Sequence, residues 1–324
     1  MNRKELLGPD TGLAKEQIVE LNKEFYDEYF EEYFEIRLLL LGEIITNPEL
    51  FSDFIKKQKI KVGVLEINPE STILNKELLL KYAKLEMSVT YYHCLETFLR
   101  VFLAHIEIKQ SPWLEISRET NYKIFKESLV TLSEGKFNFA YQGLSSDELI
   151  TYVFCGHKQL PDDVNNREEV LNAWKEWIKW AAKETIKMYD YNAYKHGLAI
   201  QSDTRGFSLG NEKDGQIKVD NDSLKFLSKK RKKDRWIWEK RVVFTPLDYR
   251  GACISIIESL IKNILTVGKL TYLGIEFESL EFLPNETCTP QYFMELSNKD
   301  KNEFGLVAMG YSMELLYYKQ KSKN

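Results

Sequence analysis

The amino-acid sequence predicts a mainly α-helical protein: an antiparallel helical bundle with a small β-hairpin insertion and a short C-terminal β segment. Two observations carry this prediction. Four long stretches repeat apolar residues at helical spacing, and the stretch between the third and fourth changes to short runs separated by Asn, Asp and Gly turns. Four long helices favour a bundle, and one domain over residues 1–324 is the simplest count.

The composition is that of an ordinary soluble globular protein. Of its 324 residues 44% are hydrophobic and 13% are aromatic, which is enough to fill a substantial core. The 45 Lys and Arg residues against 49 Asp and Glu residues leave a formal net charge of −4. This balance argues against indiscriminate binding to nucleic acid or membranes, so any such binding must come from a local patch.

The sequence gives no sign of membrane attachment or secretion. The apolar run 38–41 is far shorter than the roughly 20 residues of a spanning helix, and residues 1–5 do not lead into a signal-peptide core. The cysteines are scattered without a Cys-x-x-Cys pair, which predicts reduced and mostly buried thiols. They are Cys94, Cys155, Cys253 and Cys288. We therefore expect a cytoplasmic protein that does not bind membranes.

Residues 15–41 predict an N-terminal helix with a strongly acidic outer face. Within residues 15–37, eight acidic residues stand against three basic ones. Because exposed charged faces are the norm, a solvated face is the simple interpretation. The alternative is that this face docks against the basic stretch described below.

Residues 48–57 predict a short helix and residues 60–65 an extended run. Residues 75–106 then predict the second long helix, which is central and largely buried. Its polar residues form one stripe, because they recur at alternating steps of four and three. The stripe consists of Glu86, Thr90, His93, Thr97 and Arg100, with Glu96 adjacent. A connecting region follows over residues 107–165, with short helices at 121–132 and 145–154.

The third long helix is predicted from about residue 167 to residue 200, after cap-type residues at 163–166. Its core stripe turns polar only at Asn192 and His196, which are expected one turn apart and facing inward. The full stripe is Trp174, Ile178, Ala181, Thr185, Met188, Asn192 and His196.

Residues 205–245 predict the β insertion, with short strands at 206–210, 216–219 and 235–245. Pro246 is expected to start the fourth long helix, whose core stripe runs from Tyr249 to Val267. Beyond it, residues of about 290–320 predict a C-terminal β segment, formed as a hairpin.

Common catalytic motifs are absent from the sequence. It holds no Walker A loop, no dinucleotide-binding glycine fingerprint, no His-Glu-x-x-His and no Gly-x-Ser-x-Gly. The pair Cys155 and His157 offers two metal ligands, but a site needs three or four and nothing nearby completes it. We therefore predict neither a metal nor a cofactor.

A basic stretch that contains tryptophans is the candidate nucleic-acid interface. Over residues 225–241, nine basic residues stand against two acidic ones, so cations would meet phosphates while the tryptophans stack on bases. The simpler alternative is a solvated hairpin turn whose tryptophans pack on the bundle. The candidate residues are Lys229, Lys230, Arg231, Lys232, Lys233, Arg235, Trp236 and Trp238.

The segment Tyr191-Asn192-Ala193-Tyr194-Lys195-His196 resembles the signature of the HEPN superfamily, an arginine, a short spacer that begins with a polar residue, and a histidine near the end of a bundle helix. The resemblance extends to the bundle and to the helix that carries residues 92–97, and it covers about residues 76–270. It implies a homodimer that cleaves RNA without metal, the 2′-hydroxyl attacking its own phosphate. A formal Arg-x4-His at residues 100–105 is treated as coincidence.

Carried over residue by residue, Asn192 matches the polar residue and His196 the histidine, but Tyr191 occupies the arginine position. Tyrosine can donate a hydrogen bond to a phosphate but lacks the fixed positive fork of arginine. Lys195, or Arg100 from the polar stripe, is the expected substitute. His196 would then be the acid and base, with Asn192 orienting the substrate.

Two functions follow as expectations. The first is an RNA- or nucleotide-binding protein, a divergent metal-independent ribonuclease of a stress or defence system. The second is a catalytically inactive interaction or dimerisation module, in which His196 is satisfied within a polar core by His93 or Glu96.

Overall fold

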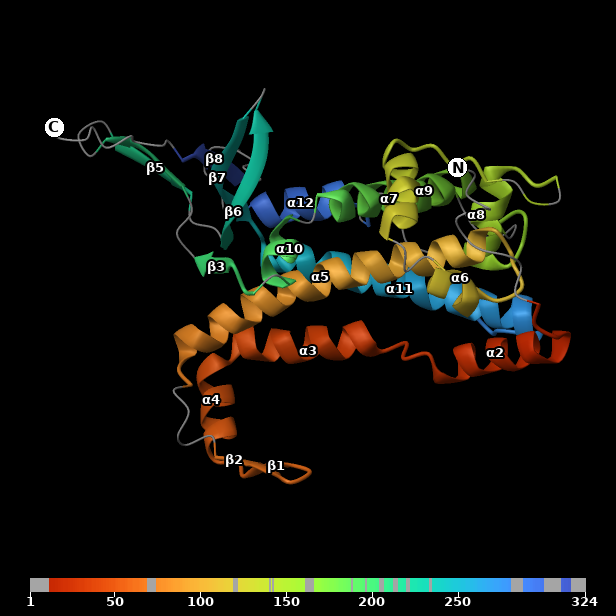
Figure 1. The fold of residues 1–324 in the computed structure, drawn as a ribbon, viewed down its shortest axis with the longest axis horizontal. Helices are drawn as coiled ribbons and strands as arrows, with labels where there is room; N and C mark the ends of the chain where they lie inside the picture. The colour runs from red at the N-terminus through yellow and green to blue at the C-terminus, as the bar shows by residue number, and fades with distance from the viewer. Residues whose placement is uncertain are drawn as a thin grey trace. The chain divides into compact units, whose positions relative to one another are not determined.

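The computed structural model describes residues 12–68, 74–118, 122–139, 141, 143–160, 166–187, 189–195, 197–203, 207–211, 215–219, 222–232, 235–280, 288–299 and 310–315. Within these ranges the protein is mainly α-helical with small antiparallel β elements (Figure 1), as the sequence predicts. The chain divides into two compact units. Unit 1 comprises residues 1–38, 90–187 and 251–294, and unit 2 comprises residues 39–89, 188–250 and 295–324.

Unit 1 is a bundle of helices. It contains α2 (Lys15–Glu28), the start of α3 (Tyr33–Thr46), the second half of α5 (Lys76–Ile106), α6 (Pro112–Arg118), α7 (Tyr122–Ser133), α8 (Ser146–Cys155), α9 (Arg167–Ile186), most of α11 (Leu247–Leu273) and the start of α12 (Pro290–Lys299). The predicted helices at 75–106, 121–132 and 145–154 are confirmed, whereas α6 was not predicted.

A stack of aromatic rings joins α5, α8 and α9. The ring of Phe154 stacks on Trp174 with a centroid distance of 4.9 Å and on Phe102 at 6.0 Å. All three side chains are fully buried. The next inward residue of α9, Trp177, donates a hydrogen bond from its indole nitrogen to the Cys288 carbonyl at 2.7 Å, so its polar atom is also satisfied.

The ends of α8 account for the Cys-Gly-His sequence. Ser145 and Glu148 form a reciprocal capping box at its start, and Gly156 ends it with a left-handed backbone, φ 75°. Cys155 is buried in the helix while His157 is exposed. Across the described ranges, no three His, Cys, Asp or Glu side chains are grouped closely enough to hold a metal ion.

The acidic N-terminal helix predicted over residues 15–41 is in fact two helices, because the backbone leaves the helical conformation at Tyr29 (φ −66°, ψ 125°). The break gives α3 a new N-terminus with unpaired amide groups. One of them, the Glu35 amide, donates to the buried carboxylate of Glu258 on α11 at 3.0 Å. This partner is distant in sequence, so periodicity alone could not reveal the break.

Seven of the eight acidic residues of this segment are exposed, which confirms a largely solvated face. Glu31 is half-buried and forms an ion pair with Lys269 at 2.7 Å. Glu35 pairs with Lys262 at 3.0 Å. The acidic segment is therefore attached to α11 at its C-terminal half.

A buried Tyr–His pair lies between α2 and α5. The His105 Nδ1 is 2.7 Å from the Val101 carbonyl oxygen and its Nε2 is 2.8 Å from the Tyr26 hydroxyl. Because a carbonyl only accepts, Nδ1 carries the hydrogen and Nε2 accepts from Tyr26. Gly268 of α11 leaves room for this pair, since a Cβ there would overlap the Tyr26 side chain.

Unit 2 carries the β structure. It contains the end of α3, α4 (Pro48–Lys56), the hairpin of β1 (Ile60–Val62) and β2 (Leu65–Ile67), the first half of α5, and α10 (Tyr189–Lys195). Its four-stranded antiparallel sheet has the order β3-β6-β7-β8, built from β3 (Ile200–Asp203), β6 (Ser223–Lys232), β7 (Arg235–Phe244) and β8 (Gly310–Glu314). A separate hairpin pairs β4 (Phe207–Asn211) with β5 (Gly215–Val219). The predicted β insertion is confirmed, although β6 was not expected to be a strand.

The third long helix is shorter than predicted. Helix α9 ends at Ile186, where Lys187 takes a non-helical conformation, and α10 follows as a separate helix. Ile200, the predicted helix end, instead begins β3 and pairs with Phe226. Burial of Ile200 beside Leu224 in the sheet core overrides its continuation of the helical pattern.

The predicted C-terminal β segment over residues 290–320 is only partly correct. Residues 290–299 form helix α12, which begins with a proline and is capped by the Thr289 hydroxyl accepting from the Tyr292 amide at 3.1 Å. Strand β8 pairs with β7 rather than forming a C-terminal hairpin. The predicted strand residues 303–309 and 316–318 lie outside the described residues.

Helix α11 is long and apolar enough, by length and composition, to cross a membrane, but 61% of its most apolar window is buried inside the structure. The core helix of a soluble protein has the same properties.

Acid should destabilise the protein through His105. Burial lowers the pKa of His105 from an ordinary 6.5 to about 4, so the unfolded chain takes up a proton at a higher pH than the folded chain. The contribution of neutral His105 to the free energy of unfolding is present above pH 6.5 and is lost as the pH falls to about 4. This contribution is on the order of 3 kcal/mol. Urea unfolding followed by circular dichroism at several pH values measures it.

In His105→Gln, we expect a lower free energy of unfolding at pH 7 and a flatter pH dependence between pH 6.5 and 4. The exposed His157→Gln variant is the control and should keep the wild-type slope. If the free energy of unfolding depended equally on pH in wild type and His105→Gln, the acid sensitivity could not be assigned to His105.

Candidate nucleic-acid interface

The basic stretch forms the long hairpin of β6 and β7 (Figure 1), which pair from Ser223 with Phe244 to Lys232 with Arg235. Side chains alternate between the two faces of a strand. The register therefore defines a tryptophan face and a glutamate face. The tryptophan face consists of Leu227, Lys229, Arg231, Trp236, Trp238 and Lys240, and the glutamate face of Phe226, Ser228, Lys230, Ile237, Glu239 and Arg241.

Both tryptophans of this face are open to solvent. Trp236 is 60% exposed and Trp238 is 52% exposed. The Lys229 ammonium nitrogen lies 5.1 Å from the centroid of the Trp236 ring and 5.9 Å from that of Trp238. These distances are within the range of cation–π contacts. A cation and two stacking platforms are thus brought together by the hairpin.

The charged side chains are distributed unevenly between the two faces of the hairpin. The buried carboxylate of Glu239 lies 3.7 Å from the Lys230 ammonium and 3.3 Å from the Arg241 guanidinium. These two cations are therefore both paired with a carboxylate within the glutamate face. The six residues that define the tryptophan face include three cations and no carboxylate.

Strand β8 extends the tryptophan face by one strand. Met313 pairs with Lys240 and is 48% exposed, and the Leu315 amide donates to the Trp238 carbonyl at 2.9 Å. Gly310 allows this pairing, because a Cβ at its position would collide with the Val242 carbonyl oxygen. The backbone of Trp238 is thus hydrogen-bonded on the β8 side as well as paired with β6.

Four of the eight predicted residues meet on the tryptophan face: Lys229, Arg231, Trp236 and Trp238. Lys230 lies on the glutamate face. Lys233 and the side chains of Lys232 and Arg235 lie outside the described residues. Sequence reasoning missed Leu227, Lys240 and Met313. Leu227 and Lys240 lie two residues from Lys229 and Trp238 on the same strands, so strand alternation could have found them. Met313 is added by a strand distant in sequence.

Helix α10, which carries the predicted catalytic residues, packs on the glutamate side of the sheet base. Tyr194 packs against Ile200, Leu224 and Phe226, and its hydroxyl donates to Glu86 at 2.7 Å. Asn192 was predicted to face inward, but it is exposed, as is Lys195. The prediction failed because α9 ends before α10 begins, so the phase of its core stripe is not carried on.

Of the remaining members of the predicted motif, the structure describes Tyr191 but not His196. The Lys195 ammonium lies 4.1 Å from the centroid of the Tyr191 ring, which gives this tyrosine a positive charge beside it. His196 lies outside the described residues.

Arg100, predicted as a catalytic residue, belongs to unit 1 with two of the predicted supporting residues, His93 and Glu96. Arg100 donates from Nε and Nη2 to Glu96 at 3.1 and 2.8 Å, and its guanidinium lies 4.0 Å from the centroid of the Phe125 ring. His93 meets the rings of Tyr33 and Phe34 edge-on at 5.5 and 5.3 Å. Within unit 1, Arg100 is thus held by an ion pair and a ring, and binding a phosphate would have to compete with Glu96.

Comparison with protein-family models, with curated proteins and with solved structures found no match to this chain. The HEPN resemblance therefore stays a prediction that rests on the sequence motif and on the helical bundle.

Tyr194→Phe should loosen α10. The variant removes the hydrogen bond to the half-buried Glu86, so we expect a loss of about 1 kcal/mol and faster amide exchange in residues 189–195. Hydrogen exchange read by mass spectrometry measures the second effect. The exposed Tyr122→Phe on α7 is the matched control, and equal exchange in both variants would show that this bond does not hold α10.

Proposed function

We propose that the protein binds single-stranded RNA on the tryptophan face. The observation that carries this proposal is the placement of Lys229 over the rings of Trp236 and Trp238, both more than half exposed. Exposed rings offer stacking platforms to unpaired bases, whereas the bases of a duplex are already stacked on each other. The face therefore favours single strands.

The charges of this face favour the same ligand. Lys229, Arg231 and Lys240 lie on the side that carries the rings, while the carboxylate of Glu239 lies on the other. A phosphate backbone that crosses the tryptophan face would meet cations without meeting a carboxylate. The motif of α10 favours RNA over DNA, since the resemblance implies a reaction of the 2′-hydroxyl.

Replacing the tryptophans should weaken binding. Each of Trp236→Ala and Trp238→Ala is expected to cost about 1–3 kcal/mol in affinity for an unstructured RNA, because one stacking platform is lost. Their high exposure makes both variants compatible with folding. Fluorescence anisotropy with a labelled oligonucleotide measures the affinities, with a duplex of the same sequence as the weaker-binding comparison.

Neutralising Lys229 and Arg231 to Gln should reduce the slope of log affinity against log salt by about 1.4, since single-stranded nucleic acids contribute about 0.7 per phosphate contact. Lys230→Gln is the matched control, because its charge is balanced by Glu239 on the other face. It should leave the slope unchanged. A reduction of about 0.7 in Lys230→Gln, the same per charge as in the double variant, would mean that the charge run acts without regard to face and would contradict the proposal.

A second activity is proposed for α10, namely metal-independent RNA cleavage by a homodimer. Asn192 and Lys195 are exposed on this helix and thus accessible to a substrate, which supports the proposal. One His196 would take the proton of the 2′-hydroxyl, and the oxygen would bond to the adjacent phosphorus. The 5′-oxygen would leave with a proton from the His196 of the second chain. Lys195 beside Tyr191 would supply the positive charge of the missing arginine.

Incubation of the protein with mixed RNAs in a metal chelator tests cleavage. We expect products with cyclic phosphate ends, and a loss of roughly a hundredfold or more in His196→Ala, because general acid and base catalysis supplies at least that much. RNA affinity should be unchanged in this variant. Cleavage that persists in His196→Ala would exclude its role, and no cleavage by either protein would favour an inactive interaction module.

A further inference from the structure

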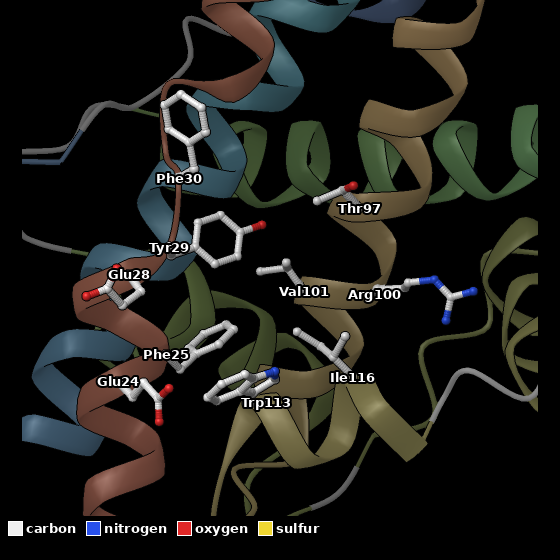
Figure 2. A pocket seen from close by; sticks show the side chains of 10 residues that line it. All are labelled: Glu24, Phe25, Glu28, Tyr29, Phe30, Thr97, Arg100, Val101, Trp113 and Ile116. Atoms are coloured by element: carbon white, nitrogen blue, oxygen red, sulfur yellow. The ribbon is translucent and has the colours of Figure 1, made fainter. Parts of the chain in front are cut away.

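Unit 1, which holds neither α10 nor the tryptophan face, contains a cavity of about 400 Å³ between α2, α5 and α6. Aromatic rings dominate one side of it. The ring of Phe25 lies between those of Tyr29 and Trp113 (Figure 2), with centroid distances of 5.4 Å between Phe25 and Tyr29 and 6.4 Å between Phe25 and Trp113. Val101 and Ile116 add an apolar wall. Its size is within the range of small-molecule sites.

The break between α2 and α3 builds this cavity. Because α2 ends at Glu28, Tyr29 leaves the helix in an extended conformation and lines the cavity beside Phe25. Burial raises the pKa of Tyr29 to about 12, so its ring is neutral at physiological pH. The exposed ring of Phe30 lies at the same cavity. The cavity is thus lined by four uncharged aromatic rings.

The electrostatic environment of the cavity is negative. Glu24 and Glu28 line it from successive turns of α2, are exposed, and have no ion-pair partner within the described part of the chain. They lie near the C-terminal end of α2, where the helix dipole is negative, and the last turn of α2 has no basic residue. The dipole at the end of α2 and the two carboxylates therefore both make the electrostatic potential of the cavity more negative.

Arg100 does not cancel this charge, although it is the only cation among the described lining residues. Its two hydrogen bonds go to Glu96 and its guanidinium lies over Phe125. In Figure 2 its side chain extends away from the three rings.

We propose that this cavity binds an organic cation, a methylated ammonium group. The faces of aromatic rings attract a cation, tryptophan most strongly. A plain ammonium is strongly hydrated, whereas methyl groups give the cation an apolar surface that packs against Phe25 and Val101. The carboxylates of Glu24 and Glu28 add long-range attraction and repel phosphate, so this cavity is not an extension of the RNA surface.

Two sources supply such a group: a free small molecule of the choline type, and a methylated lysine of another protein. The full chain is titrated calorimetrically with choline, and the titration is repeated with the neutral isostere in which carbon replaces the quaternary nitrogen. The comparison distinguishes a site that recognises the cation from one that is merely apolar. We expect the isostere to bind at least about tenfold more weakly, since only the cation gains cation–π and charge attraction. The proposal would be overturned by equal binding of choline and its neutral isostere, or if neither choline nor the trimethyl-lysine peptide bound at millimolar concentrations.

Trp113→Leu should reduce affinity for the cation about tenfold, and Glu24→Gln with Glu28→Gln should reduce it severalfold and remove its salt dependence. The two carboxylates are exposed, so the Gln variants test the site without altering the core. Glu16→Gln, also exposed and on α2 but away from the cavity, is the charge control and should bind like wild type. Unchanged binding in all the cavity variants would also overturn the proposal.

Peptides carrying trimethyl-lysine or unmodified lysine separate the two sources. Binding of the methylated peptide at least about tenfold tighter than choline would assign the site to a methylated protein, whereas choline binding as tightly as the peptide would assign it to a free small molecule. Tight binding of the unmodified peptide alone would overturn the requirement for methyl groups.

Discussion

The register between β6 and β7 decides which side chains unit 2 presents to solvent. A slip of one residue would exchange the two faces of β7 and carry Trp236 and Trp238 to the opposite side. The base of the hairpin prevents such a slip, because Leu224 and Val242 are almost completely buried there. Beside them, the Thr245 amide donates to the Asp222 carbonyl at 2.7 Å. Packing at the base thus determines the arrangement of exposed residues at the far end.

The buried Glu239 reinforces this register. A buried carboxylate is costly unless cations lie beside it, and in the observed pairing Lys230 and Arg241 both do. A shifted strand would separate these partners and leave a charge without compensation. The ion pairs therefore contribute more to specifying one arrangement than to overall stability. They also leave Lys229 and Arg231 as the cations that face outward.

The sequence predicts the elements whose signal is local. Helix α5 repeats its apolar pattern over many turns, so its bounds were predicted to within one residue. The basic residues and tryptophans of the hairpin were recognised by composition, but their division between two faces depends on strand pairing. The N-terminus of α3 is capped by Glu258, more than two hundred residues away, and Tyr29 lines the aromatic cavity from the break before it. The prediction that Asn192 faces inward was wrong because α9 and α10 are separate helices, so the helical spacing of α9 does not continue into α10.

A net charge of −4 conceals two surfaces of opposite sign, and both arise in the same way. In the acidic segment, Lys269 and Lys262 pair with Glu31 and Glu35, while Glu24 and Glu28 line the aromatic cavity. In the basic hairpin, Glu239 pairs with two cations of its own face, and the cations of the other face lie beside two tryptophans. Internal ion pairs thus remove part of each charge cluster, and the remainder lies next to rings. A ring surface flanked by one sign of charge selects ligands by charge as well as by apolar area, which a uniformly charged or uniformly apolar surface cannot do.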